Sequence, residues 1–149
     1  MIKKSVNNLS IVGFLILLIL LLVTAIGLFL AHYGFSVNNL YIQYAGDEAQ
    51  FINPKTFIGI LKSFSPHILA MPVIFFVLFH IGTTSQTFKK ESIKYIAMFG
   101  FGSTLGDIFI NFFISYGIFF AYMKVFFLVA FELTLLYMMW LFLQKIYKL

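Results

Sequence analysis

Four long apolar runs, almost free of charged residues, constrain this chain more than any other feature. They cover residues 11–31, 66–84, 95–115 and 125–144. Each run approaches the ~20 residues that a helix needs to cross ~30 Å of hydrocarbon. Hydrophobic residues make up 62% of the 149 residues and charged residues 10%, against about 45–50% and about 25% in soluble domains. The pattern predicts one all-α integral-membrane domain over residues 1–149, a four-helix transmembrane bundle.

The first run has to be distinguished from a signal peptide. The apolar part of a signal peptide holds ~7–15 residues and precedes a cleavage site of small residues. Residues 11–31 form a longer run, and no convincing site of this kind follows it. We therefore expect the run to be kept as a membrane span.

The lysines predict how the bundle is oriented. One side carries Lys3, Lys4, Lys89, Lys90, Lys94, Lys145 and Lys148. The other side carries Lys55, Lys62 and Lys124, together with Asp47 and Glu48. Because lysines favour the cytoplasmic side, both termini are expected there (N-in, C-in), and the short connections favour an up-down-up-down bundle. We expect the protein in the inner membrane of a bacterium.

The one long connection, residues 33–65, is expected on the outer side. Asn53-Pro54 is typical of a helix N-cap followed by proline at the first helical position. The apolar residues that follow predict a short interfacial helix on the membrane surface; they are Phe57, Ile58, Ile60 and Leu61. Ser65-Pro66 repeats the start signal and is expected to begin the second span.

Several kinds of chemistry are excluded by what the chain lacks. It has no cysteine, which excludes disulfides, iron–sulfur clusters and thiolate zinc sites. It has no Walker loop, dinucleotide-binding fingerprint, nucleophile elbow or His-Glu-x-x-His motif. We therefore expect no catalytic activity of its own and no nucleic-acid partner. Its expected partners are the lipid bilayer and other membrane subunits or further copies of the chain.

Polar residues recur at every fourth position of the third run and predict a polar stripe on one helix face, made of Ser103, Asp107, Asn111 and Ser115. Gly102 and Gly106 lie away from this stripe and would let a neighbouring helix approach closely. Two interpretations are open. The stripe either joins helices through hydrogen bonds, or it carries an ionisable site, since a carboxyl group is costly inside a membrane.

Glu132 in the fourth run is the second intramembrane acid. Asp107 lies 12 residues after Tyr95 and Glu132 lies 12 residues before Gln144, so both are expected about 18 Å from the cytoplasmic ends of their helices. Two acids at one depth would raise each other's pKa or share a proton or cation. Either both are protonated and hydrogen-bonded to neighbours, or they form a proton or cation relay that includes Asn111 and Ser103.

The histidines suggest a different site. His32 ends the first run and His67 follows Pro66, so both are expected at the outer boundary on consecutive helices. Neutral imidazole ligates b-type haem and metal ions. These histidines, with Met71 as a possible second haem ligand, are therefore candidate ligands of one haem b or one metal ion. The alternative is that they are ordinary interfacial polar residues.

The segment from His67 to Gly82 resembles a helix of the membrane cytochromes b, in which two histidines near opposite membrane faces ligate haem and Ile-Gly follows the inner one. Here the inner histidine is His80, followed by Ile81 and Gly82. The resemblance implies haem ligation by His67 and His80. However, a spacing of thirteen residues leaves them about 140° apart around a straight helix, unless Pro72 bends it. One haem at the outer level is therefore expected rather than two.

Three functional hypotheses follow. The first is electron transfer in a respiratory membrane complex through one haem b or a metal ion held by His67 and His32. The second is proton- or cation-coupled transport through Asp107 and Glu132. The third is a non-catalytic accessory subunit of a larger membrane complex that packs through the glycines of the third run.

Overall fold

The computed structural model describes residues 2–147. Five helices follow one another: α1 (Ile2–Tyr33), α2 (Val37–Ala45), α3 (Phe57–Thr84), α4 (Lys90–Ile110) and α5 (Ile118–Tyr147). Two short 3-10 helices, η1 (Glu48–Gln50) and η2 (Ile114–Tyr116), lie in the connections. The described residues form no strand beyond one isolated bridge between Asp47 and Ile52. The predicted all-α class is confirmed.

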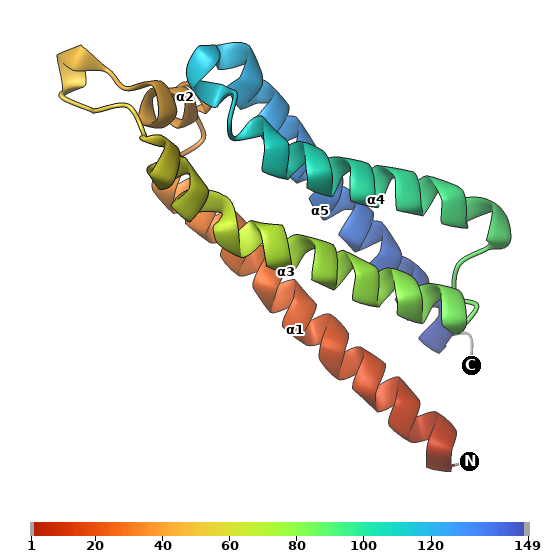
Figure 1. The fold of residues 1–149 in the computed structure, drawn as a ribbon. Coiled ribbons are helices and arrows are strands. Elements are labelled where there is room, and N and C mark those ends of the chain that lie inside the picture. Colours follow the sequence, from red (N-terminus) through yellow and green to blue (C-terminus); the bar gives the residue numbers. More distant parts are fainter. Residues whose placement is uncertain (1, 148–149) are drawn as a thin grey trace.

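Four helices are long and apolar enough to cross a membrane: α1 over Ile11–Tyr33, α3, α4 and α5. Figure 1 shows them as one bundle in which α1 diverges from the others toward its N-terminus. The short α2 covers one end, here named the cap end, and both termini lie at the opposite end, here named the terminus end (Figure 1). The four-helix transmembrane bundle is confirmed, whereas the predicted N-in, C-in orientation stays a prediction.

Two apolar clusters fill the bundle. The cluster toward the terminus end joins α1, α3 and α5 and includes Leu18, Phe75, Leu78, Leu135 and Met138. The cluster at the cap end joins α2 to the other helices and includes Leu40, Tyr44, Phe64, Ile108 and Ile114. Most other apolar side chains on the four long helices face outward, as expected for helices surrounded by lipid.

The second membrane helix begins earlier than its sequence predicts. Helix α3 begins at Phe57, where the Thr56 hydroxyl accepts a hydrogen bond from the Gly59 N–H at 3.1 Å. It then continues through Pro66 and Pro72 to Thr84. The separate interfacial helix after Pro54 and the helix start at Pro66 are therefore wrong. A proline inside a membrane helix is tolerated when neighbouring groups satisfy the freed backbone, so Pro66 does not end the helix.

The connection between the third and fourth spans also differs from the prediction. Helix α4 ends at Ile110, so Ser115 lies in η2 rather than on the helix. Helix α5 begins at Ile118, seven residues before the predicted start of the run, and therefore contains Lys124. The sequence analysis placed Lys124 on the outer side, directly before a span predicted to begin at residue 125. A partner inside the bundle makes the helical position possible, as described next.

Candidate functional site

The bundle contains a buried ion pair between two membrane-spanning helices. The Lys124 Nζ of α5 lies 2.7 Å from the Asp107 Oδ2 of α4. It also donates a hydrogen bond to the Asp107 carbonyl oxygen at 3.2 Å. Asp107 is fully buried and Lys124 nearly so. Because each charge compensates the other, both can stay ionised in a place where a single charge would be costly.

A chain of hydrogen bonds joins this ion pair to the cap end. The Asn111 side chain donates from Nδ2 to the Asp107 carbonyl oxygen at 2.6 Å. Its Oδ1 accepts from the Tyr44 hydroxyl of α2 at 3.1 Å. Burial above all, and the neighbouring Tyr33 and Asp107, raise the pKa of Tyr44 above its ordinary value. Tyr44 therefore keeps its proton and remains a donor to Asn111.

Lys55 continues the chain to the surface of the cap. Its Nζ lies 4.1 Å from the centre of the Tyr44 ring and donates to the Ser63 Oγ of α3 at 3.0 Å. Its backbone N–H donates to the Tyr44 carbonyl oxygen at 3.1 Å. Burial, and to a lesser extent the positive charge of Lys124, lower the pKa of Lys55 below its ordinary value. The connection between α2 and α3 is thus in electrostatic contact with the buried pair.

Two carboxylate oxygens are left without a hydrogen bond among the described residues. They are Asp107 Oδ1 and Glu132 Oε2, and both atoms are buried. A buried carboxylate oxygen without a donor is costly. Each is therefore a position where a proton or a cation would be stabilised.

The two acids are not joined to each other by a hydrogen bond in the described structure. Asp107 is paired with Lys124, and Glu132 lies eight residues further along α5, about 12 Å beyond Lys124. The shared depth that the sequence analysis assigned to the acids stays a prediction. Lys124, which the sequence analysis placed outside the membrane, is the residue of the buried pair that was missed. The apolar stretch Ile118–Met123 before Lys124 was the available signal.

Glu132 instead shares a cavity with His67. This cavity, of about 140 Å³, lies between α1, α3 and α5 and is lined also by Met71, Ala25 and Phe131. His67 lies ten residues after the start of α3 rather than in its first turn, which moves it away from the boundary where it was expected. His67 is exposed and Glu132 is partly buried, so this second polar position lies at the edge of the bundle rather than in its core.

The structure does not bring His32 to His67. His32 is exposed at the end of α1, where its ring lies edge-on to the Tyr33 ring with 5.3 Å between ring centres. Of the α1 residues that line the His67 cavity, Ala25 is the nearest to His32 in the sequence. Seven residues separate Ala25 from His32, or about 10 Å along the helix. His67 and Met71 are one turn apart on α3, so they approach from one side, whereas two axial haem ligands approach from opposite sides. Haem binding stays a prediction that this placement does not support.

Metal binding has no support in the described residues either, since no three histidine, aspartate or glutamate side chains converge there. His80 is exposed and stacks on Phe76 with 6.1 Å between ring centres. It lies outside the His67 cavity.

The predicted polar stripe divides into two parts. Asp107 and Asn111 form the buried site, whereas Ser103 donates only within its own helix, to the Phe99 carbonyl oxygen at 2.6 Å and to that of Gly100. Ser115 is exposed in η2. The glycines divide as well: Gly106 packs against Phe127 of α5, while Gly102 faces open space. Gly106 is therefore used inside the bundle and is not free to contact another subunit.

Comparisons with known proteins agree with the membrane fold. A family model described as a transmembrane helical domain, Aq_1264_TM, matches residues 34–149. This range contains α2 to α5, and with them the ion pair, Tyr44, Asn111, His67 and Glu132. No curated protein and no solved structure matches the chain.

Proposed function

The chain belongs to this family of transmembrane helical domains, and from that premise we propose that it takes part in proton- or cation-coupled transport, with the Asp107–Lys124 pair as the proton-binding group. The observation that carries the proposal is the buried pair together with the Asp107 Oδ1 atom, which accepts no hydrogen bond from the described residues. Ionisable groups inside membrane spans commonly mark ion pathways and proton relays.

Protonation of Asp107 would break the ion pair. When Asp107 takes up a proton, its attraction for Lys124 is lost, and the lysine charge becomes a buried cation without a counter-ion. Either Lys124 then releases a proton or it moves toward another acceptor. Glu132, two turns along the same helix, is a carboxylate in that direction. Protonation at one acid is thus coupled to charge at the other.

Access to the pair is different at the two ends of the bundle. At the cap end, the buried Tyr44 hydroxyl and the Asn111 side chain form a hydrogen-bonded link from α2 to the backbone carbonyl of Asp107. Toward the terminus end, the bundle is closed by fully buried apolar side chains, among them Phe75, Leu78, Leu135 and Met138. A proton cannot pass this apolar cluster without a change in packing, so we expect slow, carrier-like turnover rather than channel-like flux.

Proton flux into proteoliposomes tests the proposal. Vesicles that contain a pH-sensitive dye receive an acid pulse outside, with valinomycin and potassium to prevent a counter-potential. We expect the wild-type protein to acidify the interior faster than protein-free vesicles do, and Asp107→Asn to reduce this rate about tenfold or more. Ser115→Ala is the matched control, because Ser115 is exposed in η2. Wild-type flux equal to that of protein-free vesicles, or unchanged flux in Asp107→Asn, would contradict the proposal.

A further inference from the structure

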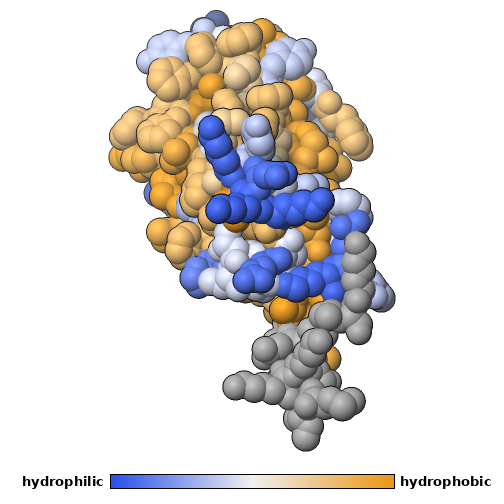
Figure 2. Space-filling model, turned by 90° about the vertical axis from the view of Figure 1, so that its right-hand side faces the viewer, coloured by the Kyte–Doolittle hydropathy of each residue, from blue (hydrophilic) through white to orange (hydrophobic). Residues whose placement is uncertain are grey.

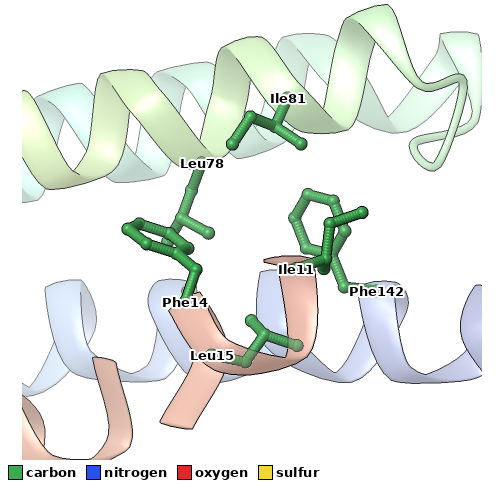
Figure 3. A pocket seen from close by; sticks show the side chains of 6 residues that line it. All are labelled: Ile11, Phe14, Leu15, Leu78, Ile81 and Phe142. Carbon is green, nitrogen blue, oxygen red and sulfur yellow. The ribbon is translucent and has the colours of Figure 1, made fainter. Parts of the chain in front are cut away.

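The Asp107–Lys124 pair is closed off from both ends of the bundle in the described structure. A cavity of about 210 Å³ lies toward the terminus end, but only apolar residues line it (Figure 3). Phe142, one of these residues, comes eighteen residues after Lys124 on α5, or about 27 Å along the helix. Leu135 and Met138 are fully buried between them. The shorter route for water to the pair is therefore from the cap end, which α2 covers.

Helix α2 closes the cap end through one buried hydrogen bond and one apolar contact. The Tyr44 hydroxyl donates to Asn111 Oδ1 at 3.1 Å, and Asn111 lies four residues after Asp107 at the end of α4. Leu40, one turn before Tyr44, packs in the same apolar cluster as Ile114 of η2. The side chains of Tyr44, Asn111, Leu40 and Ile114 are at most 2% exposed. Helix α2 thus separates the polar groups around Asp107 from water at the cap.

A glycine flanks α2 at each end. Gly34 before the helix has a φ of 65° and Gly46 after it has a φ of 84°, a conformation that other residues rarely adopt. A few residues at the ends of an element are enough to act as hinges. The outer side of α2 is held by an exposed hydrogen bond, in which Gln43 Nε2 donates to the His32 carbonyl oxygen at 2.8 Å. Water can replace such an exposed bond at little cost, so the buried Tyr44 contact is the main restraint.

We propose that α2 is a hinged lid, which opens at Gly34 and Gly46 to admit water to Asp107 and closes through the Tyr44–Asn111 hydrogen bond. Water admitted by the open lid can donate to Asp107 Oδ1, which accepts no hydrogen bond from the described residues. The closed lid keeps the pair dry, and lid opening of this kind commonly limits turnover. The lid regulates the proposed proton transport and rests on it for that role, whereas its opening is measured without transport.

Cysteine labelling under the lid tests the inference, because the chain has no cysteine of its own. Ile114 is fully buried and the neighbouring Ser115 is exposed. In the full-length protein in detergent, N-ethylmaleimide should label Ile114→Cys about tenfold more slowly than Ser115→Cys. Adding Tyr44→Phe to Ile114→Cys should speed its labelling about three- to tenfold, because only the hydrogen bond to Asn111 is lost. Tyr41→Phe is the matched control, because Tyr41 lies on the same helix and its hydroxyl makes no hydrogen bond in the described structure.

Hydrogen–deuterium exchange of the Val37–Ala45 amides gives the same test without a cysteine, and Tyr44→Phe should speed this exchange while Tyr41→Phe should not. Unchanged labelling and exchange in Tyr44→Phe, or equal acceleration by Tyr41→Phe, would overturn the lid. Proton flux in proteoliposomes is measured separately, and Tyr44→Phe should raise it by the same factor as the labelling. Faster labelling without proton flux in any variant would overturn the proposed transport and support the lid, whereas wild-type flux with unchanged labelling would support the transport and overturn the lid.

Discussion

At Gly100 the bundle has no room for a methyl group. A Cβ atom there would overlap Cε2 and Cζ of the Phe75 ring. The Phe75 side chain is fully buried and packs edge-on against Phe101, with 4.7 Å between ring centres, so it cannot move aside freely. We expect Gly100→Ala to lower the free energy of unfolding by about 1–3 kcal/mol, as overpacked cores do.

The matched control is two residues away on the same helix. A Cβ atom at Gly102 meets nothing within 4 Å, and alanine favours a helix over glycine by about 0.5–1 kcal/mol. Gly102→Ala should therefore leave the protein as stable as the wild type, or more stable. Thermal unfolding of both variants in the same detergent, followed by circular dichroism, checks the pair. Equal midpoints for the two variants would show that Phe75 adapts to the added methyl group.

We expect substitution of Asp107 to destabilise the protein more than substitution of Lys124. Asp107→Asn leaves Lys124 buried without a counter-charge, which should cost about 3–5 kcal/mol. Lys124→Met should cost less, because the remaining Asp107 can take up a proton and become neutral. The double variant Asp107→Leu/Lys124→Met removes both charges and should recover much of the loss. A double-mutant cycle on chemical unfolding measures the coupling, and additive effects would contradict a stabilising pair.

At the scale of helices, the existence of each span could be predicted but its ends could not. The apolar runs specify α1, α3, α4 and α5, because only helices satisfy their own backbone inside lipid. Their ends depend on contacts that are distant in sequence. Pro66 predicts a helix start, yet α3 begins at Phe57 with Thr56 as its cap. Lys124 ends an apolar run, yet it lies inside α5 because Asp107 on another helix compensates its charge.

The pKa of Lys55, in the connection between α2 and α3, should depend on the charge of the buried Lys124. The pKa of Lys55 is lowered mainly by burial and partly by the charge of Lys124. The unfolded chain therefore binds the Lys55 proton more tightly than the folded chain does, and this lowers the free energy of unfolding at neutral pH. The free energy of unfolding recovers as the pH rises toward 10.5, the ordinary pKa of lysine. Lys124→Met should raise the pKa of Lys55. Acetylation of Lys55 at a series of pH values, quantified by mass spectrometry, checks this; an unchanged midpoint would show that burial alone lowers the pKa.

At the scale of the whole molecule, only part of the candidate site could be predicted. The four-residue spacing predicted that Asp107 and Asn111 share one polar helix face, because that spacing is a property of one helix, and both side chains are buried in the structure. Whether His32 lies near His67 depends on how far α3 is shifted along its axis relative to α1. Because α3 begins at Phe57 rather than at Pro66, His67 lies deeper along the helix than the sequence predicts. Spacing within one helix is thus readable from sequence, whereas alignment between helices depends on where each helix begins.

The haem prediction can be tested by one spectrum of the purified protein. A haem ligated by His67 and His32 would be low-spin, with a sharp Soret band and resolved α and β bands after reduction with dithionite. Because about 10 Å along α1 separates His32 from the His67 cavity, we expect no such spectrum from protein produced with ample haem. A low-spin spectrum that disappears in His67→Ala and persists in His80→Ala would restore the haem hypothesis.

The charges at its two ends predict the orientation of the bundle. Figure 2 shows hydrophilic residues gathered at the side where α3 connects to α4, where Lys89, Lys90 and Lys94 lie on the exposed surface. Lys148 is outside the described residues. Because Lys124 lies inside the bundle, only Lys55 and Lys62 remain toward the cap end, close to Asp47 and Glu48. The excess of lysines at the terminus end is therefore larger than the sequence alone predicts. This excess favours an orientation in which the terminus end faces the cytoplasm.

Single cysteines can measure this orientation directly, because the chain has no cysteine of its own. Asp47→Cys lies in the connection at the cap end, and Lys90→Cys lies at the start of α4. In intact cells, a membrane-impermeant maleimide should label the first and should label the second only after the membrane is permeabilised. The opposite pattern would place the cap in the cytoplasm. The cap side of the buried pair would then face the cytoplasm, and the direction of the proposed transport would be reversed.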